Sequence, residues 1–184
     1  SGLIIVAKNM LSAALLGKAM QQRMIRREYL AVVCGTLTGS GTVHAPIARV
    51  KPGDVRRQVD FLCGDDAITH YKSLLCHAPY SLLSLHLETG RTHQIRVHMK
   101  YIGHTLFNDE RYGGHDILKG TTFTKYKQFV QNCFAICPRQ ALHAKTLGFV
   151  HPTTGEEMFF DSEIPSDMQQ LIDRWRVYAN TKEL

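Results

Sequence analysis

The amino-acid sequence predicts one α+β domain in which a mixed, largely antiparallel sheet is flanked by helices. Several short segments are either continuously apolar or alternate between apolar and polar residues, as β-strands do. One segment with helical periodicity lies between them and another lies near the end of the chain. No internal repeat or linker divides the sequence, so we expect residues 1–184 to form a single domain, with 115–138 as a variable insertion.

The first part of the chain is expected to alternate strands with a helix. Residues 3–7 are continuously apolar, which predicts a strand buried on both faces. Asn9 is expected to cap a helix that continues through about Arg27 and has a broad apolar stripe. Residues 28–34 predict the next strand, and residues 42–47 predict an extended segment.

Hairpins and a final helix are expected in the rest of the chain. Residues 67–76 and 81–88 predict two paired strands, and a second hairpin is expected around the turn at 152–155. Ser166 and Gln169 have the spacing of a capping box at the start of the final helix. The side chains of that helix expected to face the core are Met168, Leu171, Ile172 and Trp175.

Residues 88–103 change from strand periodicity to helix periodicity. Ile95, Met99 and Ile102 recur at i, i+4 and i+7, so they are expected on one side of a helix with Thr92 as its N-cap and Gly103 after its last turn. Arg91 and Arg96 lie near the start of this helix, which suggests an anion site. A corner with solvated basic residues is the alternative interpretation.

The charge balance permits a polyanionic partner. The chain has 22 Lys and Arg against 16 Asp and Glu, a net charge of +6 and a pI of about 9.1. A turn at 51–54 is flanked by Arg49, Arg56 and Arg57, which suggests a hairpin that contacts a nucleic acid backbone, although a solvated hairpin would have the same sequence. The arginines at 23, 26 and 27 either complement a helix dipole or contact phosphate, and the sequence does not favour one role.

Other site classes find little support. The five cysteines form no C-x-x-C pair, which indicates reduced thiols in a cytoplasmic protein rather than disulfides or a zinc site. His93 and His98 are five positions apart and do not share a helical face as zinc-binding pairs do. No G-x-S-x-G, G-x-G-x-x-G or phosphate-binding loop is present, and no apolar run is long enough to cross a membrane. We expect no metal and no cofactor. These patterns alone favour a domain that binds RNA or a phosphate ligand.

Residues 88–99, with the sequence E-T-G-R-T-H-Q-I-R-V-H-M, resemble the signature of the RluA-type pseudouridine synthases, which modify ribosomal and transfer RNA. Further segments resemble family motifs in the same order, namely residues 1–3 with 6–8, 27–31 with Gly35, 67–71, 139–144 and 151–156. The likeness covers nearly the whole chain and is weakest at 115–138. Thr105 replaces the usual proline and Asn108 the usual glycine, which puts the local backbone shape in doubt.

The resemblance implies the catalytic core of an enzyme that isomerises uridine to pseudouridine without metal or redox chemistry. It implies that Tyr29 stacks on a flipped uridine and is a candidate for removing the C5 proton, and that Arg96 pairs with the nucleophilic aspartate. Leu142 would pack in the base pocket. Ordinary core packing is the alternative for Tyr29 and Leu142, and a solvated helix residue is the alternative for Arg96. The candidates for supporting or RNA contacts are Arg91, His93, Gln94, Arg56 and Arg57.

The family's nucleophile stands in an R-L-D motif just before the S-G-L with which this chain opens. The aspartates at 54, 60, 65, 66 and 109 do not stand in that context. We therefore expect the N-terminal part of the core to be missing, Arg96 to lack its partner and the chain to be inactive alone. The alternative is a relative that binds RNA without catalysis. In either case we expect a monomeric, cytoplasmic protein with RNA as its partner.

Overall fold

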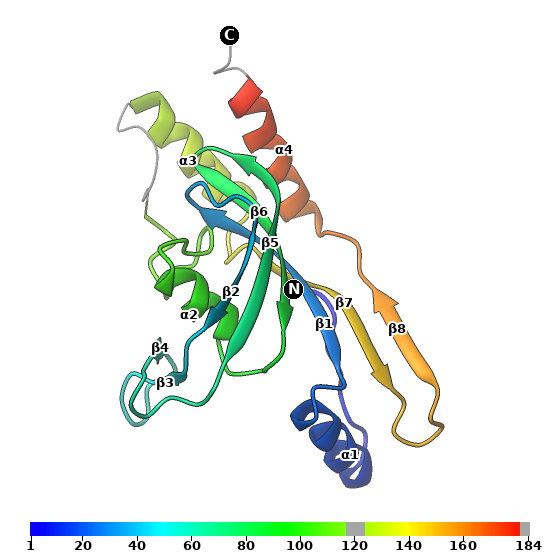
Figure 1. Cartoon of the computed structure of the whole chain (residues 1–184). Helices are drawn as coiled ribbons and strands as arrows, with labels where there is room; N and C mark the ends of the chain where they lie inside the picture. Colours follow the sequence, from blue (N-terminus) through cyan, green and yellow to red (C-terminus); the bar gives the residue numbers. More distant parts are fainter. Residues whose placement is uncertain (117–123, 181–184) are drawn as a thin grey trace.

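The computed structural model describes residues 1–116 and 124–180, and it is organised around a six-stranded antiparallel sheet (Figure 1). The strand order is β2-β5-β6-β1-β7-β8. The strands are β1 (Arg26–Cys34), β2 (Ser40–His44), β5 (Ile68–His77), β6 (Tyr80–Leu87), β7 (Leu142–Val150) and β8 (Glu157–Asp161). A second sheet pairs β3 (Ile47–Arg49) with β4 (Arg57–Val59). The predicted α+β fold with a largely antiparallel sheet is confirmed.

Helices cover both faces of the central part of the large sheet. The helices are α1 (Met10–Gln21), α2 (Gln94–Tyr101), α3 (Thr124–Ile136) and α4 (Ser166–Asn180). Alternate residues of β1 face opposite layers, so Leu30 and Val32 pack with α3 and α4, whereas Ala31 and Val33 pack with α2. In Figure 1, α1 projects from one end of the sheet, and α3 and α4 lie toward the other.

The predicted hairpins are all present. β5 pairs with β6, β7 pairs with β8, and β3 pairs with β4 across the basic turn at 51–54. Gly53 occupies the left-handed position of that turn, with φ of 80°, and Asp54 donates its N–H to the carbonyl of Lys51 at 3.1 Å. The turn chemistry in the sequence therefore located this hairpin correctly.

The strand expected at residues 3–7 is absent. An isolated bridge joins Gly2, just before this segment, to Ala144, and the side chains of Ile4 and Val6 are 82% and 74% exposed. The reason is that β8 pairs with β7 from Thr146 to Val150, so only the beginning of β7 remains open to the first residues of the chain. An apolar run alone does not indicate which sheet edge is already occupied.

The first helix is shorter than expected. Asn9 caps it as predicted, because its side chain accepts the N–H of Ser12 at 2.8 Å. The helix ends at Gln21 rather than near Arg27, since Arg23 adopts a left-handed conformation with φ of 59° and Met24 donates back to the carbonyl of Ala19. This C-terminal motif usually contains glycine at the left-handed position, so the sequence carried no stop signal. The expected apolar stripe of α1 is not buried in this structure.

The described part of 115–138 contains α3, which is amphipathic. Tyr126, Val130 and Cys133 are buried, and Phe129 packs edge to face on Trp175 of α4 with ring centroids 4.8 Å apart. These contacts define α3 as an amphipathic helix that packs against α4. Lys119 and Phe123, in the same predicted insertion, lie outside the described residues. The variable character of 115–138 stays a prediction.

Two of the predicted caps differ from the structure. His93, not Thr92, precedes α2, and it has a left-handed φ of 58°. The capping box at Ser166 and Gln169 is also wrong, because the carboxylate of Asp167 accepts the N–H of Met168, while Gln169 donates its side-chain amide to Asp173. The positive φ of Gly103 after α2 is confirmed, as is burial of the four predicted core residues of α4.

Within the described residues, no helix combines the length and apolarity needed to cross a bilayer.

Replacing Trp175 by alanine is expected to reduce the free energy of unfolding by about 3–5 kcal/mol. Trp175 is 3% exposed, and its ring centroid lies 4.0 Å from that of Tyr80 and 5.7 Å from that of Tyr178. Urea unfolding measures the change, with Gln170→Ala on the exposed side of α4 as the control, expected within about 0.5 kcal/mol of the unmodified protein. Equal effects of the two substitutions would contradict the assigned core.

Candidate active site

Arg96 and Asp109 form a bidentate ion pair beneath the surface. The Nε and Nη2 groups of Arg96 each donate to a different carboxylate oxygen of Asp109 at 2.7 Å. The Arg96 side chain is 11% exposed and that of Asp109 is 0% exposed. Parallel charge-assisted bonds of this kind fix both side chains in one orientation. Arg96 thus has a carboxylate partner within the described residues, while its predicted pairing with the nucleophilic aspartate stays a prediction.

The loop that carries Asp109 is fixed to three other elements. Phe107 donates its N–H to Val32 of β1 and accepts the N–H of Ala141, which precedes β7. Asn108 donates its side-chain amide to the carbonyl of Cys137, just after α3, at 2.7 Å. A Cβ atom at Gly114 would lie 1.8 Å from the carbonyl oxygen of Leu106, so only glycine fits there. Asp109 is thus held in place by its backbone as well as by Arg96.

Asn108 adopts a left-handed conformation with φ of 55°. Asparagine tolerates this region better than most residues, because its short polar side chain bonds locally. Its backbone N–H donates to the carbonyl of Gly114 at 2.8 Å. The replacement of glycine at this position is therefore compatible with a left-handed turn.

Tyr112 lies beneath the ion pair and was not identified from the sequence. The guanidinium carbon of Arg96 lies 4.7 Å from the ring centroid of Tyr112, which is 4% exposed. The hydroxyl accepts the backbone N–H of Arg57 at 2.9 Å and lies 2.8 Å from Nδ1 of His93. Burial raises the pKa of Tyr112, and partial burial followed by the nearby Arg96 lowers the pKa of His93. In sequence, Tyr112 lies in a polar segment that predicts only a loop, so no local pattern identifies it.

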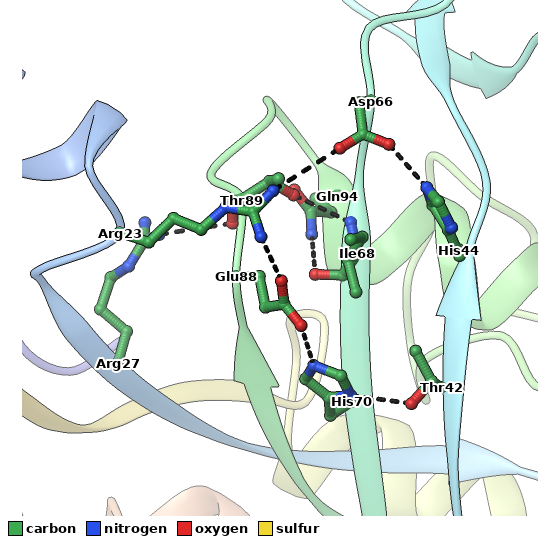
Figure 2. Close-up of polar contacts among 10 residues, drawn as sticks. All are labelled: Arg23, Arg27, Thr42, His44, Asp66, Ile68, His70, Glu88, Thr89 and Gln94. Atoms are coloured by element: carbon green, nitrogen blue, oxygen red, sulfur yellow. Dashed lines mark hydrogen bonds and ion pairs between the residues drawn. The ribbon is translucent and has the colours of Figure 1, made fainter.

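The corner before α2 is secured by the buried side chain of Gln94, which is 2% exposed (Figure 2). Its amide oxygen accepts the hydroxyl of Thr89 and the N–H of Arg91, and its amide nitrogen donates to the carbonyl of Ile68 and the hydroxyl of Thr69. Both ends of the amide are therefore used in hydrogen bonds that support the corner.

A second buried side chain, His98, extends this arrangement toward β2. Its Nε2 lies 2.8 Å from the carbonyl of Ala45 and its Nδ1 lies 2.9 Å from the hydroxyl of Thr69. A carbonyl can only accept, so Nε2 carries the hydrogen and Nδ1 accepts from Thr69. Burial lowers the pKa of His98, which favours this neutral form. His93 and His98 therefore both act in hydrogen bonds.

Arg23, between α1 and β1, and Arg27, in β1, support the same corner. Arg23 pairs with Glu88 at 2.5 Å and approaches Asp66 at 3.9 Å, and Glu88 also binds Nε2 of His70 at 2.7 Å (Figure 2). Arg27 donates to the carbonyl of Thr89 at 3.3 Å. These contacts provide a structural role for Arg23 and Arg27 that the sequence did not predict. The side chain of Arg91 lies on the outside of the corner, 43% exposed, and its Nε donates to the carbonyl of Asp66.

Tyr29 and Leu142 lie on the sheet face that packs against α2. Tyr29 is opposite Ala144 in the β1–β7 register, and Leu142 is opposite Ala31. Both are partly buried against the apolar cluster that includes Ile95 of α2. The structure therefore places these residues on one face with the helix that carries Arg96.

Two hollows lie along the chain segment 139–147. Tyr29 lines a hollow of about 200 Å³ together with Leu3, Arg27 and Ala144. Arg96 instead lines a larger hollow of about 490 Å³, whose other polar and charged walls include Asn108, Arg111, His115, Arg139 and Gln140. Tyr29 and Arg96 thus do not line one common hollow in this structure.

Ser1 contacts residues 142–144, of which Ala144 lines the smaller hollow. Its amino group donates to the carbonyl of Leu142 at 3.2 Å, and its backbone carbonyl accepts the N–H of Ala144. Partial burial and the nearby Arg139 lower the pKa of this amino group. Any group joined to the nitrogen of Ser1 would therefore lie close to Arg139, which is itself paired with Asp167 at 2.8 Å.

The guanidinium groups of the β3–β4 hairpin are partly used within the hairpin. Arg56 forms a bidentate pair with Asp54 and lowers the pKa of that carboxyl to about 2, while Nη1 of Arg57 donates to the carbonyls of residues 54–56. A groove of about 370 Å³ lies beside the contact between this hairpin and α2, and its basic residues are Arg56, Arg57, Lys100 and Arg111. Within the described residues, no group of three His, Cys, Asp or Glu side chains is arranged to hold a metal ion.

Asp109→Asn is expected to reduce the free energy of unfolding by about 3–5 kcal/mol, because it leaves the charge of Arg96 buried without its partner. The exposed pair of Asp173 with Arg176, at 3.6 Å, provides the control, and Asp173→Asn is expected to cost about 0–1 kcal/mol. Urea unfolding of both variants measures the two changes in the free energy of unfolding. A loss below 1 kcal/mol for Asp109→Asn would show that Arg96 does not depend on this carboxylate.

Comparison with known proteins identifies relatives over most of the chain. Residues 1–101 match the family model described as RNA pseudouridylate synthase. The ribosomal large subunit pseudouridine synthase D of Vibrio cholerae is 41% identical over 172 residues, which are 93% of this chain and 51% of that protein. The protein of the same name from Haemophilus influenzae is 39% identical over 173 residues, covering 94% of this chain and 52% of the relative. The chain thus spans about half the length of the curated relatives it matches.

Solved structures share the fold. Human RNA pseudouridylate synthase domain containing 4 superposes with a TM-score of 0.67 at 20% identity, covering 89% of this chain and 67% of that one. For human RNA pseudouridylate synthase domain containing 1 the TM-score is 0.63 at 23% identity, with coverage of 93% and 74%. The family model, the curated relatives and the sheet with its Arg96-bearing helix agree, and the chain belongs to the RNA pseudouridylate synthase family, as its resemblance to the RluA type indicated.

Proposed function

We propose that the protein containing these residues is a pseudouridine synthase that isomerises uridine in ribosomal or transfer RNA. The observation that carries the proposal is the placement of Arg96 and Tyr29, both within matched motifs, on the helix and the sheet face that pack together. Similarity to curated synthases over 93% of the chain supports the same conclusion.

The proposed reaction breaks the bond between C1′ of ribose and N1 of uracil, rotates the base and forms a bond from C1′ to C5. The C5 proton leaves and N1 gains one, so the reaction has no net redox change. Tyr29 would stack on the flipped base and is the candidate for accepting the C5 proton. Leu142 would form an apolar wall of the base pocket. Partial exposure of both side chains leaves them accessible for these roles.

Arg96 is proposed to orient the nucleophilic carboxylate. A guanidinium has five N–H donors, and Asp109 uses one on Nε and one on Nη2, which leaves three for a second anion. Arg96 also lines the 490 Å³ hollow, so a second carboxylate has space to approach it. Asp109 would then hold Arg96 in position while the free N–H groups bind the nucleophile.

Asp109 is a poor candidate for the nucleophile itself. Its side chain is 0% exposed, and one of its oxygens accepts the N–H of Tyr112 at 3.2 Å in addition to the Arg96 pair. Attack on ribose needs an accessible oxygen. We propose instead that the nucleophile belongs to the family motif that precedes S-G-L, and that residues 1–184 alone are inactive. The position of Ser1 beside Leu142 and Arg139 supports this arrangement.

RNA is the proposed partner, bound in part by the groove between the β3–β4 hairpin and α2. Four basic side chains line this groove, and the whole chain has a net charge of +6. Arg56 and Arg57 would contribute to RNA binding there, with Arg91 and His93 contacting RNA or supporting the corner. A monomeric state and a cytoplasmic location stay predictions.

Residues 1–184 are expected to bind unmodified RNA transcript but to form no pseudouridine. Binding should weaken as salt rises, because released counterions contribute to the affinity. Filter binding across a salt series and quantification of pseudouridine after long incubation measure the two properties. Pseudouridine formed by this chain would contradict the assignment of the nucleophile to a position before Ser1.

In a protein that carries R-L-D directly before Ser1, Arg96→Ala and Tyr29→Phe are each expected to lower turnover by about 10² or more. In variants that thermal unfolding shows to be folded, RNA affinity should remain within about twofold, since neither residue is assigned to backbone binding. Arg176→Ala, on the exposed part of α4, is the control and should turn over normally. Normal rates in either site variant would exclude its assigned role. If another residue replaces the aspartate of R-L-D, the protein is instead an RNA-binding relative without activity.

A further inference from the structure

We propose that Tyr112 is a positioning residue that links the β3–β4 hairpin to Arg96, so that RNA bound at the hairpin fixes the orientation of Arg96. The inference rests on the proposed function and deepens it. Its basis is that Tyr112 contacts the hairpin, the beginning of α2 and both members of the ion pair.

The ring of Tyr112 restricts Arg96 from one side. The guanidinium carbon lies 4.7 Å from the ring centroid, a distance at which a cation and an aromatic face attract each other. Asp109 binds the same guanidinium through two bonds of 2.7 Å. The N–H of Tyr112 donates to the Asp109 carboxylate, so one residue contacts both charges. A movement of Tyr112 would therefore change the contacts of Arg96 directly.

The hydroxyl of Tyr112 connects this pair to the hairpin. Because the oxygen accepts the N–H of Arg57, the first residue of β4, its hydrogen is free to be donated to Nδ1 of His93. That bond requires a neutral His93 with its hydrogen on Nε2, which fits the lowered pKa of this side chain. His93 immediately precedes α2, the helix that carries Arg96.

Ordinary core packing does not account for this arrangement. The ring of Tyr112 does pack in a small apolar cluster with Ile47, Ala67 and Val97. A phenylalanine would fill that space equally well, whereas the two bonds of the hydroxyl join elements that are distant in sequence. Removing only the hydroxyl, as in Tyr112→Phe, therefore keeps the packing of the ring and abolishes the two bonds that would couple the hairpin to α2.

The same residue borders the proposed RNA groove. Tyr112 lines the 370 Å³ groove with Arg56, Arg57, Lys100 and Arg111. A phosphate bound there would attract the hairpin and α2 toward each other, and the bond from Arg57 to Tyr112 crosses between them. RNA binding would in this way favour the conformation in which the guanidinium of Arg96 stays over the ring.

The test uses nitrogen-15 NMR of the Arg96 Nε–H group in residues 1–184, with and without an RNA stem-loop. In the unmodified chain we expect this resonance to shift when RNA binds. In Tyr112→Phe we expect RNA affinity within about twofold but loss of most of the RNA-induced shift, since the hydroxyl link is absent. His93→Ala, which removes the acceptor of the hydroxyl, should act in the same direction. Tyr71→Phe on β5 removes a hydroxyl elsewhere in the sheet and is the control.

A turnover assay of the R-L-D-containing protein completes the test. Tyr112→Phe is expected to lower kcat by about tenfold with little change in KM, less than the roughly hundredfold cost of a displaced reacting group. Thermal unfolding of each variant establishes that it is folded under the assay conditions. An unchanged kcat together with an unchanged NMR response in folded Tyr112→Phe would overturn the proposal. If the NMR response depends on the hydroxyl but no protein forms pseudouridine, the coupling stands and the proposed function fails.

Discussion

A buried ion pair is the constraint on which this part of the molecule depends. Placing Arg96 and Asp109 out of water is unfavourable unless each charge is matched by the other and by further bonds. That requirement explains why the loop carrying Asp109 is tied to β1, to the segment before β7 and to the end of α3. The sheet, the loop and α2 must therefore form together for the pair to be satisfied.

A second layer of polar groups supports α2 without any formal charge. Gln94, Thr69 and His98 form a continuous line of hydrogen bonds from the corner to the backbone of β5 and to Ala45 after β2. Every polar atom in this line has a partner, which is the condition for burying such groups at low cost. Together, the Arg96–Asp109 ion pair and these uncharged hydrogen bonds leave α2 little freedom to rotate. That rigidity suits a helix whose arginine must present its remaining donors in one direction.

Local sequence patterns identified most strands, the turn at 51–54 and the buried face of α4, because alternation and turn chemistry depend on near neighbours. They failed at residues 3–7, where pairing of β8 with β7 decides exposure, and at Arg23, which replaces the usual glycine. For the site, the resemblance selected Arg96 and Tyr29. It could not reveal that Asp109, thirteen positions along the chain, pairs with Arg96, since that contact depends on loop geometry.

The neutral state of His98 has a consequence for the energetics of the whole fold. Its pKa is lowered from 6.5 by burial, so below that pH the unfolded chain takes up a proton that the folded corner resists. The stability that this imidazole provides is complete above pH 6.5 and declines as acidity increases. The hydrogen bonds of His98 beneath α2 thus make the free energy of unfolding depend on pH.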